Sequence, residues 1–194
     1  YAAGAVQPGD EDDYFQSSLF TIARRRILWL LILVLANGLT TKVIAMNDQI
    51  LKEIVLLAAF IPLLIGTGGN VGAQSSTVVI RGLSTQKLKS LGAVKAVVKE
   101  AITGALLGVL MMLVVFPFAW WQGEGPLIAS AVGISLISIT TLAATTGAIL
   151  PLLFDKMRLD PALMSSPFIT TVTDIAGVFI YLNTAKWLLS SSLI

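Results

Sequence analysis

Residues 62–75 read PLLIGTGGNVGAQS and lie inside an apolar stretch that extends from about residue 54 to residue 80. Pro62 removes a backbone hydrogen-bond donor and bends a helix, and glycines weaken one. Asn70 and Gln74 place polar groups where hydrocarbon is expected. Irregular polar backbone at membrane depth survives only where it lines a cavity or is buried in protein. We therefore expect an irregular segment that lines a wet cavity. A closely packed, glycine-rich helix is the alternative, but it leaves Asn70 and Gln74 unexplained.

The composition of the whole chain indicates a membrane protein. Of its 194 residues, 56% are hydrophobic and only 12% are charged, and the mean hydropathy is +0.87. An ordinary soluble domain carries about 25% charged residues. A chain with this composition would expose large apolar patches in water, so lipid is the solvent that fits it. We predict an all-α integral membrane protein of about five transmembrane helices.

Cysteine and histidine are both absent from the chain. Their absence excludes a disulfide framework, a typical zinc site, a thiol nucleophile and a histidine general base. No other nucleophile–base pair is visible, so we do not expect an enzyme. The sequence pI near 9.0 does not indicate a nucleic-acid partner, because membrane topology explains the basic residues better.

The chain divides into an acidic arm and one membrane domain. Residues 1–18 are polar and acidic, and we interpret them as an exposed arm or the stub of a linker. Residues 19–194 form the predicted membrane domain. Its five apolar segments cover approximately residues 27–45, 54–80, 96–120, 127–154 and 167–189.

The distribution of lysine and arginine predicts the orientation of these segments. With the amino terminus in the cytoplasm and the carboxyl terminus outside, ten of the thirteen basic residues lie on the cytoplasmic side. These ten are Arg24, Arg25, Arg26, Arg81, Lys87, Lys89, Lys95, Lys99, Lys156 and Arg158. Only Lys42, Lys52 and Lys186 lie near the outer face. The positive-inside rule therefore favours this orientation and an odd number of spans.

Asp174 is the acidic residue that lies well inside an expected span. An ionised carboxylate at such depth costs several kcal/mol unless it faces water, a cation or a partner. Thr170, Thr171, Gly177 and Tyr181 share its helical face at positions i−4, i−3, i+3 and i+7. We infer a cation in a wet cavity as the partner of Asp174. An interhelical hydrogen-bond network, or a protonated carboxyl group inside the bundle, is the alternative.

Two other patterns indicate packing within the bundle. Gly104 and Gly108 form a small-xxx-small face, for which packing inside the bundle is favoured over dimerisation. Threonine hydroxyls can bond the carbonyls of their own helix, which is the use we expect in the fourth segment. The threonines concerned are Thr140, Thr141, Thr145 and Thr146.

The chain resembles the membrane domain of the MgtE family of Mg²⁺ channels over approximately residues 18–190. Residues 62–75 carry the first match. The second comprises Asp160-Pro161-Ala162, Ser166-Pro167, Asp174-Ile175-Ala176-Gly177 and Tyr181. The family often has Asn where this chain has Ser166, so a side-chain carbonyl ligand is missing at that position.

The resemblance implies a homodimer in the inner cell membrane, with five helices per subunit and a pore at the twofold axis. Asp174 of each subunit would bind the water shell of a Mg²⁺ ion, which is the transported ion. The second and fifth helices would line the pore. We take as lining residues Gly68, Gly69, Asn70, Gln74, Ser166, Thr170, Thr171, Gly177 and Tyr181. The soluble Mg²⁺-sensing domains usual in the family are not in this chain.

The chemistry of the ion agrees with this implication. Mg²⁺ holds six oxygens at about 2.0–2.1 Å and dehydrates reluctantly, so carboxylates can bind it through its water shell. Softer transition metals would require histidine or cysteine, whereas other hard divalent cations remain open. Two alternatives to a channel also remain: an exchanger that couples Mg²⁺ to Na⁺ or H⁺, and a structural subunit in which Asp174 is an assembly contact.

Overall fold

The computed structural model describes residues 18–85 and 92–191, and within them it contains helices and no strand. This confirms the all-α prediction. The elements are α2 (Leu19–Ala45), α3 (Asp48–Glu53), α4 (Val55–Ser84), α6 (Ala93–Ala119), the π-helix η1 (Trp120–Glu124), α7 (Gly125–Lys156) and α8 (Pro161–Ser191). The acidic arm up to residue 17, and Lys87 and Lys89 of the charge argument, lie outside the described residues.

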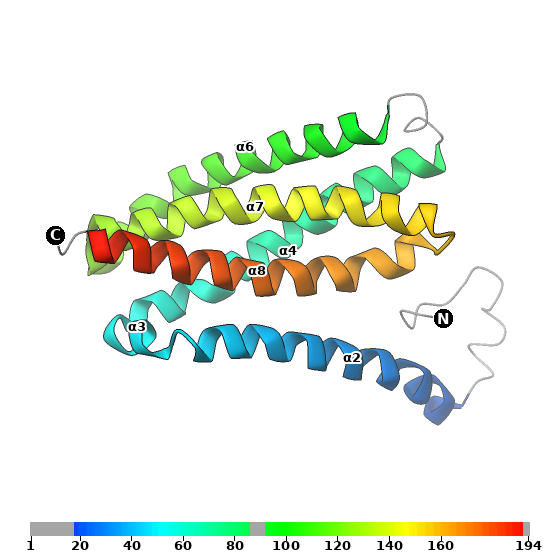
Figure 1. Cartoon of the computed structure of the whole chain (residues 1–194), viewed down its shortest axis with the longest axis horizontal. Helices are drawn as coiled ribbons and strands as arrows, with labels where there is room; N and C mark the ends of the chain where they lie inside the picture. The colour runs from blue at the N-terminus through cyan, green and yellow to red at the C-terminus, as the bar shows by residue number, and fades with distance from the viewer. Residues whose placement is uncertain (1–17, 86–91, 192–194) are drawn as a thin grey trace.

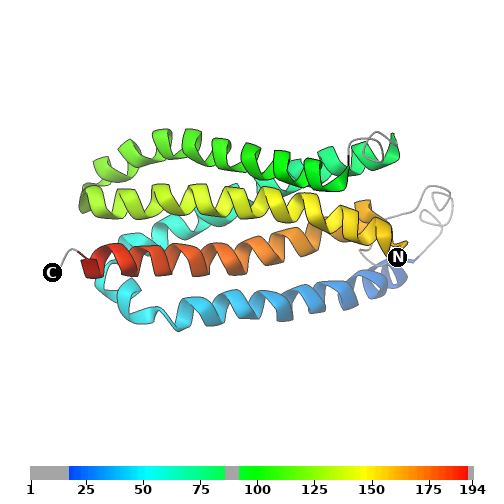
Figure 2. The same cartoon turned by 45° about the horizontal axis from the view of Figure 1, so that its top comes forward.

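The five long helices lie along one axis and alternate in direction (Figure 1). α4 crosses behind α7 and α8, whereas α2 lies beside α8 (Figures 1 and 2). One end of the bundle contains the start of α2, the end of α4, the start of α6, the end of α7 and the start of α8 (Figure 1). We call it the basic end, because eight of the eleven described basic residues lie there: Arg24, Arg25, Arg26, Arg81, Lys95, Lys99, Lys156 and Arg158.

Four helices are long and apolar enough to cross a membrane among the residues that the structure describes. They cover Val55–Ser84, Ala93–Gln122, Gly125–Lys156 and Ser165–Ser190. α2 contributes a shorter apolar stretch, Leu30–Ala45. Four of the five predicted spans are thus found by length and composition.

α8 begins at Pro161, six residues before the expected start at Pro167. Asp160 precedes this start, and the Ala162 N–H donates to its Oδ1 over 2.9 Å. A carboxylate at the N-cap followed by proline at the first helical position is a favoured way to begin a helix. The apolar segment expected at about residues 167–189 is found as the candidate span Ser165–Ser190. The helix itself begins earlier, because the cap depends on local hydrogen bonds and not on hydropathy.

The expectation of an irregular second segment was also wrong, because α4 is one helix from Val55 to Ser84. Its buried glycines allow close helix contacts. A Cβ added at Gly68 would lie 2.8 Å from Ile139 Cγ2, and one added at Gly72 would lie 2.5 Å from Ile169 Cγ2. The packing alternative is therefore right for Gly68 and Gly72.

α6 and α7 contact each other in the same way. A Cβ added at Gly104 would lie 2.5 Å from the Thr140 carbonyl oxygen, and one added at Gly108 would lie 2.5 Å from Ile137 Cα. The Thr140 hydroxyl donates to the Leu136 carbonyl over 2.8 Å. Both packing predictions, for the glycine pair and for this threonine, are confirmed.

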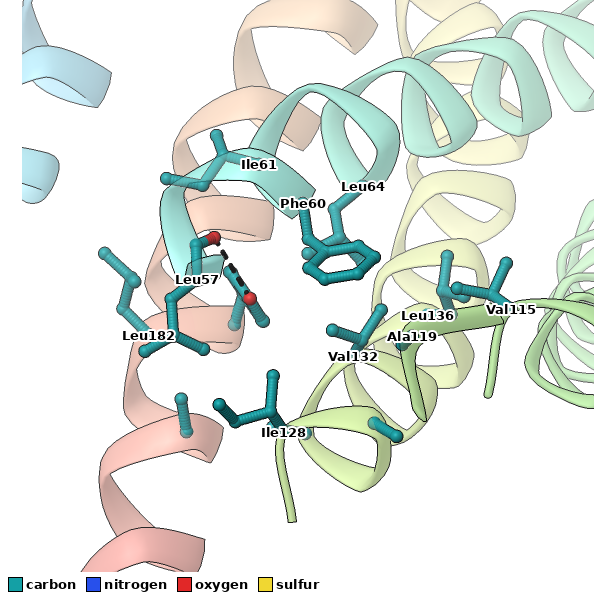
Figure 3. Close-up of a cluster of buried hydrophobic side chains, with 14 of the residues drawn as sticks. Leu57, Phe60, Ile61, Leu64, Val115, Ala119, Ile128, Val132, Leu136 and Leu182 are labelled. Atoms are coloured by element: carbon teal, nitrogen blue, oxygen red, sulfur yellow. Dashed lines mark hydrogen bonds between the residues drawn. The ribbon is translucent and has the colours of Figure 1, made fainter. Parts of the chain in front are cut away.

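The main hydrophobic cluster joins α4, α6, α7 and α8 near the end opposite the basic end (Figure 3). Leu57 from α4, Leu136 from α7 and Leu182 from α8 are fully buried in it. At about 25 cal/mol per Å², burial of such side chains stabilises a soluble protein by about 2 kcal/mol each. In lipid that term is small, and close packing carries the stability. This cluster holds together the parts of α4 and α8 that lie away from the basic end.

Candidate functional site

Asp174 lies in the middle part of α8, thirteen residues after Pro161 and seventeen before Ser191. At 1.5 Å per residue, both ends of the helix are about 20 Å or more away. The carboxylate is half-buried, and none of the described residues forms a hydrogen bond or ion pair with it. The described residues also contain no group of three acidic side chains that could hold a metal ion within one subunit.

Between Asp174 and the basic end, α8 presents hydroxyl groups. Ser166 and Thr170 are exposed, and Thr171 is half-buried. The Thr170 hydroxyl donates to the backbone carbonyls of Pro167 at 3.0 Å and Ser166 at 3.3 Å. The Thr171 hydroxyl donates to the Pro167 carbonyl at 2.9 Å. These residues precede Asp174 by one to two turns on the same helix.

α4 adds amide groups to the same region. Asn70 and Gln74 are exposed and stand one turn apart. α4 and α8 adjoin here, because a Cβ added at Gly69 would lie 3.9 Å from Thr170 Cγ2. Gly66, one turn from Asn70, has open space around it. The sequence reasoning missed Gly66 as a member of this surface, although its spacing of four residues from Asn70 was a usable signal.

We call the open and half-buried residues of α4 and α8 around Asp174 the α4/α8 polar surface. Its members come from two helices and face outward or are half-buried in the single subunit. They are Gly66, Gly69, Asn70, Gln74, Ser166, Thr170, Thr171 and Asp174.

Three predicted lining residues lie elsewhere. Gly68 and Gly177 are buried, and a Cβ added at either would contact Ile139 of α7 at 2.8 Å or 3.7 Å. Tyr181 is fully buried, and its hydroxyl donates to the Leu57 carbonyl over 3.1 Å, the dashed line in Figure 3. The stripe predicted from Thr170 to Tyr181 is therefore open only as far as Asp174. Beyond that point α4 and α7 cover it, because α4 crosses α8 at an angle.

The match to a known family covers this same surface. Residues 61–184 match the family model of MgtE, described as a divalent cation transporter. This range contains every member of the α4/α8 polar surface. The chain belongs to the MgtE family.

Individual MgtE proteins are similar over most of this chain. It is 37% identical over 166 residues to the magnesium transporter MgtE of Thermus thermophilus, covering 86% of this chain and 37% of that protein. The magnesium transporter MgtE of Bacillus subtilis is 34% identical over 176 residues, 90% of this chain and 39% of that protein. That of Enterococcus faecalis is 35% identical over 168 residues, 84% of this chain and 36% of that protein. The chain thus spans little more than a third of the length of these MgtE relatives.

Proposed function

We propose that this chain forms the pore of a Mg²⁺ channel, as a homodimer whose two α4/α8 polar surfaces face each other across a twofold axis. The observation that supports this proposal is that Asp174 is a half-buried carboxylate in the middle of α8, with no partner among the described residues. A single carboxylate at this depth is unfavourable. A hydrated divalent cation between two such carboxylates, one from each subunit, would neutralise both negative charges.

The chemistry of the surface supports a hydrated ion as substrate. Mg²⁺ retains its water ligands readily, and those waters donate hydrogen bonds outward. Carboxylate, hydroxyl and amide oxygens accept such bonds. Asp174, Thr170 and Asn70 supply one oxygen of each kind on the α4/α8 polar surface. The names of the MgtE relatives, magnesium transporters, support the same ion.

The charge distribution supports an orientation with the basic end in the cytoplasm. Eight described basic residues lie at the basic end, against Lys42, Lys52 and Lys186 at the other. We propose that α2 also crosses the membrane, as the first of five spans, which places the carboxyl terminus outside. Thr170 would then lie on the cytoplasmic side of Asp174.

A channel is favoured over an exchanger on one observation. Transporters that work by alternating access are typically built with broken helices at the substrate site, whereas α4 is continuous through residues 62–75. Single-channel current steps are the expected result in planar bilayers. Mg²⁺ uptake that requires an opposing Na⁺ or H⁺ gradient would instead establish an exchanger.

Purified protein in liposomes tests the proposed role of Asp174. Asp174→Asn should lower Mg²⁺ uptake at least tenfold, or relax selectivity toward monovalent ions, because it removes the charge and keeps the shape. Asp155→Asn is the matched control, since Asp155 is an exposed carboxylate at the basic end, away from the α4/α8 polar surface. Selective uptake by a folded Asp174→Asn dimer would leave Asp174 as an assembly contact and overturn the proposal.

Cross-linking tests the dimer directly, because the chain contains no cysteine. Thr170→Cys should be linked between subunits in membranes by a bifunctional maleimide with a spacer of about 10 Å, because two side chains that hold a hydrated ion between them are too far apart for a disulfide. Leu106→Cys on α6, which is 59% exposed, is the control that should remain monomeric. The opposite pattern would place the subunit interface on α6.

A further inference from the structure

The hydrogen bonds of Thr170 and Thr171 determine what their hydroxyl groups can offer to a ligand. A hydroxyl group has one proton to donate and two lone pairs that accept. Thr170 donates its proton to the carbonyls of Pro167 and Ser166, and Thr171 donates its proton to the carbonyl of Pro167. With the proton used within the helix, each oxygen presents only lone pairs to the α4/α8 polar surface.

Because of these bonds, neither threonine hydroxyl donates to the Asp174 carboxylate. Residues three and four apart on a helix are neighbours, so Thr170 and Thr171 could have donated to the carboxylate. The structure pairs both hydroxyls with backbone carbonyls instead, and no described residue donates to Asp174. Three neighbouring groups on α8 therefore all act as acceptors.

We propose that Thr170 and Thr171 form an acceptor ring, four hydroxyls in the dimer, that binds the water shell of the transported cation beside Asp174 toward the basic end. This inference rests on the proposed function and names specificity-determining residues for it. The ring receives hydrogen bonds from the aqua ligands of a divalent cation, which donate outward. It offers no proton to an anion such as phosphate.

The competing interpretation is that these threonines only bond their own helix, as buried and exposed threonines often do. Thr103 provides a control that distinguishes this interpretation from the acceptor ring. Its hydroxyl donates to the Lys99 carbonyl over 2.8 Å at an exposed position of α6, away from the α4/α8 polar surface. Thr103→Val therefore removes the same helix bond without touching the proposed ring.

The test compares Thr170→Val, Thr170→Ser and Thr103→Val in the full chain. Valine keeps the shape and removes the acceptor, and serine keeps the acceptor. In liposomes, Thr170→Val should raise the Mg²⁺ concentration for half-maximal uptake about thirtyfold, the equilibrium equivalent of two hydrogen bonds, because the dimer carries two copies of Thr170. Thr170→Ser should restore the wild-type value, and Thr103→Val should not change it.

A second readout is the Mg²⁺-dependent rise in melting temperature, which reports binding without transport. Thr170→Val should reduce that rise, and Thr103→Val should not. If Thr170→Val equals Thr103→Val in both readouts while Asp174→Asn abolishes uptake, the acceptor ring is wrong and the channel proposal stands. If the wild type takes up no Mg²⁺ but Thr170→Val still reduces the thermal shift, the ring is supported and the transport proposal fails. Absence of both uptake and shift in the wild type overturns both.

Discussion

The two faces of α4 differ although one run of sequence, residues 62–75, supplies both. Gly68 and Gly72 form a packing face, where α7 and α8 approach so closely that no side chain fits. Gly66, Asn70 and Gln74 lie on three successive turns and form an open face. The comparison teaches that the glycines of this run have two uses, and that helical spacing divides them.

The largest effect is expected where the packing face is closed. A Cβ added at Gly147 of α7 would clash with the backbone carbonyl oxygen of Gly72, so Gly147→Ala requires α4 and α7 to separate. We expect Gly147→Ala to destabilise the protein by about 3 kcal/mol, since overpacking strains the backbone. Thermal unfolding in detergent micelles measures the change. An unaltered melting temperature would show that the two helices are not in such close contact.

A smaller effect is expected where α8 joins the packing face. Tyr181→Phe removes the hydroxyl that donates to the Leu57 carbonyl and should cost about 1 kcal/mol of stability. Mg²⁺ selectivity should remain that of the wild type, because Tyr181 is fully buried within the subunit. Altered selectivity at unchanged stability would return Tyr181 to the pore lining and break the distinction between the two faces.

The smallest effect on stability is expected on the open face. Gly66 has open space around it, so Gly66→Ala should stabilise α4 by up to about 1 kcal/mol through helix propensity. Mg²⁺ uptake should nevertheless fall, because the added methyl groups narrow the proposed pore. Melting temperature and liposome flux, measured on the same preparation, test both parts. A large loss of stability would instead indicate that a second copy of the chain packs closely against Gly66.

The residues that share one helical face could be predicted from sequence, because a single helix decides that outcome. The spacing of Thr170, Thr171 and Asp174 gives one face of α8 in any packing arrangement. The same spacing also included Gly177 and Tyr181, which the structure buries. Periodicity along one helix does not state how far a crossing helix covers its face.

The sequence by itself determined the membrane class, the approximate positions of the apolar segments and the isolation of Asp174, because hydropathy and charge are sums over local residues. Only the tertiary structure decided that α4 continues through its glycine run and which of those glycines contact other helices. It also decided that the stripe on α8 is open on the basic-end side of Asp174 and buried beyond it. The physical reason is that these outcomes depend on crossing angles and on contacts between helices distant in sequence, for example Gly72 with Gly147 and Leu57 with Tyr181.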